Sequence, residues 1–162
     1  MKILHTADWH VGKTVRGHSR ADEHRAVLDE IVTITHERAV DIVVVAGDLF
    51  DTASPTPESE HLVYQALLGL RDAGAHVVVI AGNHDNPERL AFAQSLLAEG
   101  RLFIYGPVQK DARPVVLYDE FGPVYFAPLT YADPFTATNA AALELTSHEA
   151  ALRWQVESML AQ

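Results

Sequence analysis

Three short clusters of polar side chains contain the residue types that bind metal ions and transfer protons. They read Asp8-Trp9-His10, Gly47-Asp48-Leu49-Phe50-Asp51 and Gly82-Asn83-His84-Asp85. Their donor atoms are carboxylate oxygens, imidazole nitrogens and a carboxamide oxygen, and the 162-residue chain contains no cysteine. A nitrogen and oxygen donor set without sulfur suits Mn²⁺, Fe²⁺ or Zn²⁺ better than Ca²⁺ or copper. The clusters therefore indicate metal-dependent chemistry.

The spacing within the clusters suggests a role for each side chain. Asp8 and His10 are two residues apart, so in an extended backbone both point the same way and can reach one ion. Asp48 has two carboxylate oxygens and can bridge that ion to a second one about 3.5–4 Å away. Asn83 then serves the second ion, and His84 is placed to protonate a leaving alkoxide or to stabilise charge on phosphorus. The expected ligands of two divalent ions are therefore Asp8, His10, Asp48 and Asn83, and His84 is the expected catalytic residue.

Each cluster directly follows an apolar segment that is typical of a buried strand. These strand candidates span residues 2–6, 42–46 and 76–81. Apolar residues at helical spacing, with capping residues and prolines at the starts, predict helices over residues 19–38, 56–74 and 86–100. The β-α-β-α-β-α order predicts an α/β fold with a mainly parallel sheet. The carboxyl ends of neighbouring parallel strands form a ligand-binding crevice, so the three clusters should meet there.

The pattern changes after residue 100. Short strand candidates at residues 102–105, 114–118 and 124–127 follow one another without helices, which is typical of antiparallel or mixed strands. Residues 128–146 show no clear period, and residues 147–160 have the spacing of one more helix. No linker divides the chain, so we expect a single domain over residues 1–162 with a mixed, mainly parallel sheet.

The composition limits the partner and the compartment. A formal charge of −10 argues against a protein that binds nucleic acid through a basic surface. Metal ions held in a carboxylate cluster would reverse the local field, so DNA stays compatible with this charge. No signal peptide and no apolar run of about 18 residues is present, and the lack of cysteine fits a reducing compartment. We expect a cytoplasmic protein without a membrane segment.

Other polar residues near the clusters allow more than one interpretation. Lys13, Arg16 and Arg20 lie in the segment after the first cluster. They either contact DNA phosphates or serve as ordinary solvated loop residues. His5, inside the first strand candidate, is interpreted as a hydrogen-bonded core residue.

The motifs resemble those of a known enzyme family. Asp8-x-His10, Gly47-Asp48-x-x-Asp51 and Gly82-Asn83-His84-Asp85 are similar to the first three motifs of the calcineurin-like metallophosphoesterases. Residues 3–13 and the Tyr131-Ala132-Asp133-Pro134 turn narrow the resemblance to the SbcD/Mre11 branch, the nuclease subunits of DNA double-strand-break repair. The resemblance implies an αββα sandwich, a site with two Mn²⁺ ions, and 3′–5′ exonuclease activity with endonuclease activity on DNA.

The resemblance also implies site residues and partners. In this family the metal ligands are the residues that match Asp8, His10, Asp48 and Asn83. The residue matching His84 is catalytic, and Asp51 fits the bacterial branch with its role left open. The implied partners are DNA, a coiled-coil ATPase of the SbcC/Rad50 type, and a second copy of the nuclease. In the family the helices after the second and third motifs build that homodimer. The apolar residues of 62–70 and 90–97 could serve it here, and packing on the sheet explains them equally well.

The chain departs from the family pattern in its later part. The family completes its site with a histidine after a later strand and a Gly-His-x-His motif, and neither is found in these 162 residues. His148 is the only histidine after His84, and its helical context predicts a solvated residue rather than a ligand. We therefore expect the N-terminal part of a metallophosphoesterase domain that is C-terminally incomplete. The capping and ATPase-docking segments would be absent, and the chain weakly active or inactive.

Two other functions remain open from the sequence. One is a small metallophosphoesterase that acts on nucleotides or phosphomonoesters. The other is a non-catalytic remnant that binds metal or dimerises.

Overall fold

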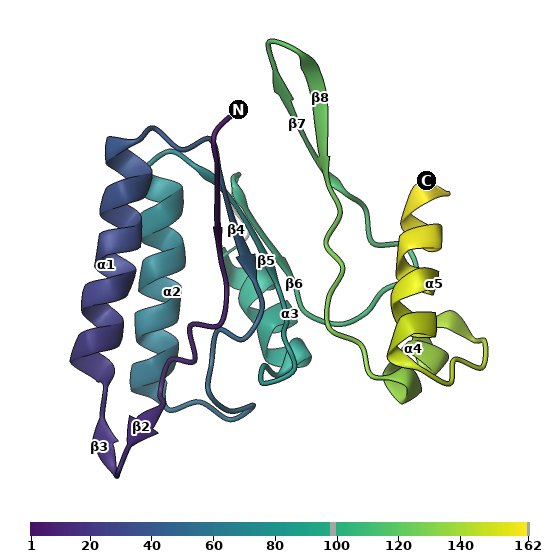
Figure 1. Cartoon of the computed structure of the whole chain (residues 1–162), viewed down its shortest axis with the longest axis horizontal. Coiled ribbons are helices and arrows are strands. Elements are labelled where there is room, and N and C mark those ends of the chain that lie inside the picture. Colours follow the sequence, from purple (N-terminus) through teal and green to yellow (C-terminus); the bar gives the residue numbers. More distant parts are fainter. Residues whose placement is uncertain (98–99, 162) are drawn as a thin grey trace.

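A parallel sheet forms the centre of the computed structural model, which describes residues 1–97 and 100–161. Its strands lie in the order β1-β4-β5-β6, and every neighbouring pair is parallel (Figure 1). The strands are β1 (Ile3–Thr6), β4 (Ile42–Ala46), β5 (His76–Ile80) and β6 (Leu102–Tyr105). The predicted α/β fold with a mainly parallel sheet is confirmed.

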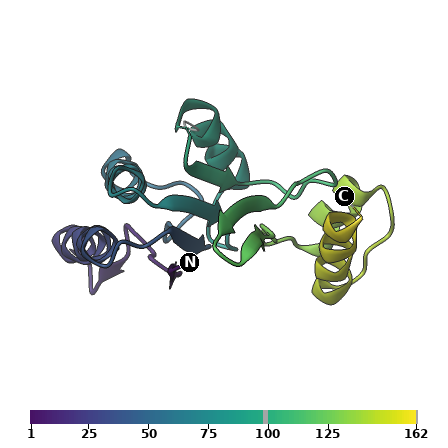
Figure 2. The same ribbon diagram turned by 90° about the horizontal axis from the view of Figure 1, so that it is seen from above.

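Helices cover one face of this sheet (Figure 2). They are α1 (Ala21–Glu37), α2 (Pro57–Asp72) and α3 (Pro87–Leu97). Because side chains alternate along a strand, Val43 and Val45 of β4 point toward the helices and pack with Leu67 of α2. All three side chains are fully buried. Full burial of one such side chain contributes roughly 1.5–3 kcal/mol, so this face anchors the sheet.

A β-hairpin covers part of the opposite face. Strands β7 (Val115–Asp119) and β8 (Gly122–Phe126) pair antiparallel in a separate two-stranded sheet, in agreement with the expected antiparallel strands. Val115 of the hairpin packs against Ile42 and Val78 in the middle of the main sheet. The outer strand β1 shows a different environment. His5 is exposed there, so its expected place in the core is wrong.

Two further helices, α4 (Pro134–Ala141) and α5 (His148–Leu160), pack against each other beside the main sheet (Figure 1). Trp154 of α5 is buried in their contact with Ala137 and Ala141 of α4. The backbone ties this pair to the sheet, because the Tyr131 amide donates to the Ala81 carbonyl at 2.9 Å.

The segment between β1 and α1 carries a small hairpin where only a loop was expected. Its strands are β2 (Thr14–Val15) and β3 (His18–Ser19). The hairpin lies at the end of the molecule toward which β1 runs (Figure 1). Among the described residues no helix is long and apolar enough to cross a membrane.

Removal of one buried side chain tests the packing of α2 on the sheet. Leu67→Ala should lower the free energy of unfolding by about 2–5 kcal/mol, because it leaves a cavity in a region without solvent. Urea denaturation measures this change. The matched Leu152→Ala on α5 removes a side chain that is 49% exposed and should cost no more than about 0.5 kcal/mol. Equal losses in the two variants would contradict the described packing.

Candidate metal centre

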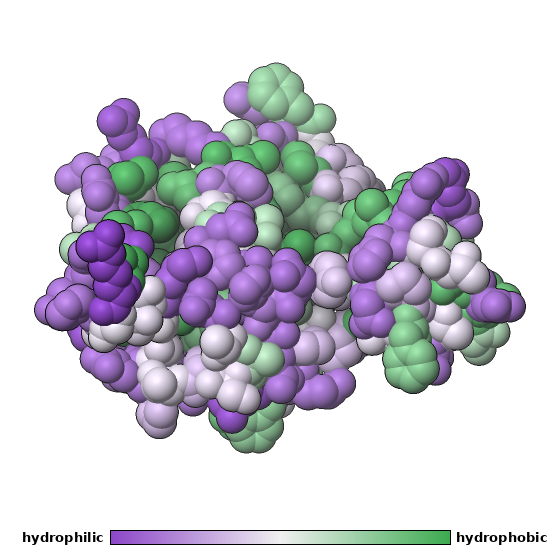
Figure 3. Space-filling view, turned by 60° about the horizontal axis from the view of Figure 1, so that its bottom comes forward, coloured by the Kyte–Doolittle hydropathy of each residue, from purple (hydrophilic) through white to green (hydrophobic). Residues whose placement is uncertain are grey.

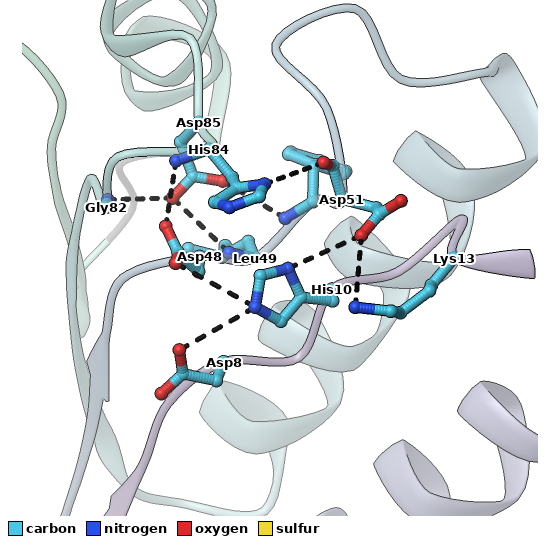
Figure 4. Close-up of polar contacts among 10 residues, drawn as sticks. Asp8, His10, Lys13, Asp48, Leu49, Asp51, Gly82, His84 and Asp85 are labelled. Atoms are coloured by element: carbon cyan, nitrogen blue, oxygen red, sulfur yellow. Dashed lines mark hydrogen bonds and ion pairs between the residues drawn. The ribbon is translucent and has the colours of Figure 1, made fainter.

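The three polar clusters meet at the carboxyl ends of β1, β4 and β5 (Figure 4). The parallel register explains this, because Thr6 pairs with Val45 and Ala46 pairs with Ile80, so the strands end at nearly the same level. The first two clusters stay paired beyond the strands. The Asp8 amide donates to the Gly47 carbonyl at 3.1 Å. The prediction that the clusters come together is met by this geometry.

The backbone at these strand ends is unusual. Asp8, His10 and Asp48 have positive φ values of 55°, 45° and 52°. Such left-handed conformations cost a non-glycine residue roughly 1–2 kcal/mol and are concentrated at functional sites. The expectation that Asp8 and His10 converge because the chain is extended was therefore right in its result and wrong in its reason. Two left-handed residues, rather than a regular strand, turn the side chains toward each other.

The His10 imidazole faces two carboxylates across gaps that no hydrogen bond fills. Its Nε2 atom lies 3.7 Å from Asp8 Oδ1 and 3.9 Å from Asp48 Oδ2. These distances exceed the hydrogen-bond range. Ligands that each lie about 2.0–2.2 Å from one ion are separated by roughly 3–4 Å. The separation and the donor chemistry of Asp8, His10 and Asp48 therefore fit a divalent cation.

His84 completes the cluster from the third strand end. Ligand atoms of His10, Asp48 and His84 all lie within 4.8 Å of one another. The rings of the two histidines meet edge to face with centroids 4.7 Å apart. The His84 amide donates to Asp48 Oδ1 at 2.9 Å, which ties the third cluster to the second. Asn83 lies in the same exposed turn, one residue before His84, and its role as a ligand stays a prediction.

Asp51 approaches both histidines. Its backbone carbonyl lies 2.8 Å from His84 Nδ1 and accepts a hydrogen bond when that nitrogen carries the proton. In this tautomer Nε2 of His84 carries no proton when the ring is neutral and one proton when the ring is charged. That atom can therefore both accept and donate a proton. The Asp51 carboxylate lies 3.6 Å from His10 Nδ1, a buried nitrogen without a hydrogen-bond partner among the described residues. A carboxylate beside the far nitrogen of a metal-binding histidine orients the ring.

The sequence alone did not single out Asp85. Its carboxylate is buried and accepts hydrogen bonds from the backbone amides of Gly82, Leu49 and Phe50. Burial raises the pKa of Asp85, and these hydrogen bonds oppose the shift. The only signal in the sequence was its position as the last residue of the third cluster.

The three basic residues take different positions around the site. Lys13 Nζ lies 3.8 Å from Asp51 Oδ1, so this residue reaches the cluster. Arg20 pairs with Glu23 at the start of α1. Arg16 lies at the exposed tip of the β2–β3 hairpin with a φ of 51°. Figure 3 tilts this end of the molecule toward the viewer, and hydrophilic residues gather over its centre. Contacts of these residues with DNA stay predictions.

A comparison with protein families agrees with this geometry. The family model for calcineurin-like phosphoesterases matches residues 1–141. The chain belongs to this family. The SbcD subunit of nuclease SbcCD from Bacillus subtilis (strain 168) is 50% identical to this phosphoesterase over 107 residues, which cover 65% of the chain and 27% of that protein.

Further relatives of this phosphoesterase carry the same name. The SbcD subunit from Rhodobacter capsulatus is 41% identical over 112 residues, 68% of this chain and 28% of that protein. The protein of that name from Escherichia coli (strain K12) is 41% identical over 98 residues, 60% of this chain and 24% of that protein. The chain thus spans about a quarter of the length of the curated relatives it matches.

The expected binding of metal by this chain can be tested through its effect on stability. Mn²⁺ at a hundredfold excess over its Kd should raise the free energy of unfolding by about 2.7 kcal/mol. Asp48→Asn should lose most of this gain, because the carboxamide carries no charge for the ion. The carboxamide oxygen can still accept from the His84 amide, so the contact between the two loops is kept. Calorimetry with and without Mn²⁺ gives both values. Asp119→Asn, at the end of β7, is the control and should keep the gain. Equal gains in both variants would argue against Asp48 as a ligand.

Proposed function

We propose that this chain carries the metal centre of a DNA nuclease that resembles the SbcD subunit of nuclease SbcCD. The observation that carries the proposal is the arrangement of Asp8 and Asp48 around His10 Nε2, with His84 beside them. The identities of 41–50% to proteins named as nuclease subunits support the same activity. The proposed reaction is hydrolysis of phosphodiester bonds, with 3′–5′ exonuclease and endonuclease modes.

The proposed cofactor is a pair of divalent ions, with Mn²⁺ as the expected metal. Asp8, His10, Asp48 and Asn83 would hold it. Bound cations of this kind neutralise charge on a phosphate and clamp its oxygens. The donor set of nitrogen and oxygen atoms supports such ions.

The protein residues supply the remaining steps. His84 Nε2 delivers a proton to the leaving alkoxide, while the Asp51 carbonyl holds Nδ1 of that ring. Lys13, beside the cluster, and Arg16, on the hairpin tip, are the proposed contacts to backbone phosphates. Arg20 is placed with them in sequence, but its pairing with Glu23 makes it the weakest of the three candidates.

The proposed partners follow from the same resemblance. The relatives are named as one subunit of nuclease SbcCD. We infer a complex with a coiled-coil ATPase of the SbcC/Rad50 type and a place in the cytoplasm. Residues 1–162 would form one phosphoesterase unit in such a complex.

Loss of the acid distinguishes the proposed function from its alternatives. His84→Ala should lower the Mn²⁺-dependent release of nucleotides from linear duplex DNA by about 10²–10⁴-fold, because the leaving alkoxide then has no acid beside it. The release of acid-soluble nucleotides measures the rate. His36→Ala, which removes an exposed histidine at the end of α1, is the control and should keep the wild-type rate.

The same assay separates the other functions. Hydrolysis of a chromogenic phosphodiester without cleavage of DNA would favour a phosphoesterase for small substrates. Bound Mn²⁺ without turnover of either substrate would favour a module that only binds metal or dimerises.

The surface of α3 supports a homodimer as a second proposal. Phe92 and Leu96 are 67% and 66% exposed, and they border a hollow of about 620 Å³ that Tyr64 of α2 also lines. Leu90 and Ala93 are buried on the sheet instead. Packing on the sheet, one of the two interpretations of residues 90–97, therefore accounts for Leu90 and Ala93 but not for Leu96. The side chain of Leu97 lies outside the described residues.

The aliphatic residues of α2 leave no such surface. Those between residues 62 and 70 that form its stripe are buried against the sheet: Leu62, Val63, Ala66, Leu67 and Leu70. Packing on the sheet, one of the two interpretations of that stripe, therefore accounts for it. The dimer surface proposed here consists of Phe92, Leu96 and Tyr64.

Charge on this surface tests the dimer. The double variant Phe92→Asp, Leu96→Asp should shift the protein from dimer to monomer. Each copy would then bury two carboxylates in the interface, opposite the same two carboxylates of the other copy. Light scattering coupled to gel filtration measures the mass. Phe121→Asp, which changes an 87% exposed phenylalanine in the β7–β8 turn, should leave the mass unchanged. A wild-type protein that is monomeric at all concentrations would reject the proposal.

A further inference from the structure

The feature that the proposed mechanism leaves unused is the buried carboxylate of Asp85. It is 6% exposed and lies outside the expected ligand set. Its Oδ2 atom accepts from the Gly82 amide at 2.9 Å and from the Leu49 amide at 3.3 Å. Its Oδ1 atom accepts from the Phe50 amide at 3.0 Å (Figure 4). One side chain thus joins two loops that follow different strands.

Each of these amides belongs to a residue within two positions of an expected metal ligand in the sequence. Leu49 directly follows Asp48, and Gly82 directly precedes Asn83. The carboxylate therefore holds the backbone on which both ligands stand. A second link crosses the same gap, because the His84 amide donates to Asp48 Oδ1 at 2.9 Å.

The two loops approach so closely that only glycine fits between them. A Cβ atom on Gly82 would lie 2.1 Å from Asp48 Oδ1, and one on Gly47 would lie 2.8 Å from the Gly82 Cα atom. Neither distance is compatible with van der Waals contact. Any increase in the separation of the loops would therefore move Asp48 relative to Asn83.

Only a carboxylate satisfies the three donors. Ionised Asp offers two oxygens with about four acceptor positions, whereas Asn offers one oxygen and an NH₂ group. In Asp85→Asn that NH₂ group would face backbone N–H groups, and at least one buried donor would lose its partner. Leu49 and Phe50 are buried, so no solvent replaces the lost bond.

The geometry points to Asp85 as a positioning residue that fixes Asp48 relative to Asn83 and so sets the affinity of the site for divalent ions. This inference rests on the metal centre proposed above but not on DNA as the substrate. Asp85 touches neither an expected ion nor a reacting atom, so its effect reaches the site through the two loops.

Binding of Mn²⁺ alone tests the inference without any measurement of turnover. In the wild-type protein, calorimetric titration should show bound Mn²⁺, and Asp85→Asn should bind it at least tenfold more weakly. Asp85→Glu keeps the charge and both oxygens, so it should recover binding. Its longer side chain displaces Leu49 and Phe50 from Gly82, so the electron paramagnetic resonance spectrum of the bound ion should differ from that of the wild type.

A matched control excludes a general loss of stability. Asp119 also accepts a backbone N–H group, from Phe121 at 2.9 Å, but it lies at the end of β7 and pairs with the amino terminus of the chain. Asp119→Asn should therefore keep wild-type affinity for Mn²⁺.

The outcomes separate this inference from the proposed nuclease. Wild-type affinity for Mn²⁺ in Asp85→Asn would falsify the positioning role. If that variant does not fold, Asp85→Glu decides, and an unchanged spectrum there overturns the inference. A wild-type protein that binds Mn²⁺ but does not cleave DNA contradicts only the nuclease. A wild-type protein that binds no Mn²⁺ overturns both.

Discussion

The parallel pairing of β4 with β5 is the constraint on which the site depends. Ala46 pairs with Ile80, so both strands deliver their following residues to the same level. Gly47 and Gly82 then meet without room for a Cβ atom on either of them. Because the backbones touch there, Asp48 can accept from the His84 amide across the two loops. A slip of one residue in this register would bring another residue into the contact where Gly82 has no room for a Cβ atom. The register therefore fixes the geometry of the site.

Much of this architecture follows from local patterns in the sequence. The apolar runs of β4 and β5 allowed only buried strands, and Thr56 with Pro57 marked the start of α2. The helix α4 was missed, although Asp133 and Pro134 form the same kind of start. The reason is its short, alanine-rich sequence, which has no apolar period to detect. The structure of the candidate site was less accessible, because the left-handed backbone at Asp8, His10 and Asp48 has only a weak signal in the sequence: Asp and His adopt it more often than most residues but still uncommonly. Tertiary context decided two further points. Leu96 faces outward because Leu90 and Ala93 already occupy the contact with the sheet. His5 is exposed because the β7–β8 hairpin packs on the middle of the sheet rather than on β1.

The proposed function requires an acidic chain to attract a polyanion, and the electrostatics of the site bear on this requirement. Asp8, Asp48, Asp51 and Asp85 gather within one cluster, and Lys13 is the cation that pairs with it among the described residues. Such a cluster repels a phosphate unless cations are bound, and bound cations invert its field. Under the proposed function, affinity for a phosphate and affinity for metal are therefore coupled. The net charge of −10 then limits binding away from the metal centre, so a phosphate is attracted where the ions are held.

Asp51 shows how two chemically identical rings receive different tasks. Its carboxylate approaches His10 Nδ1, and its backbone carbonyl accepts from His84 Nδ1. The Nε2 atom of His10 is thereby directed at two carboxylates, as a ligand requires. A backbone carbonyl, rather than a side chain, holds Nδ1 of the other ring. The different roles proposed for His10 and His84 therefore correspond to the different parts of Asp51 that the two rings meet.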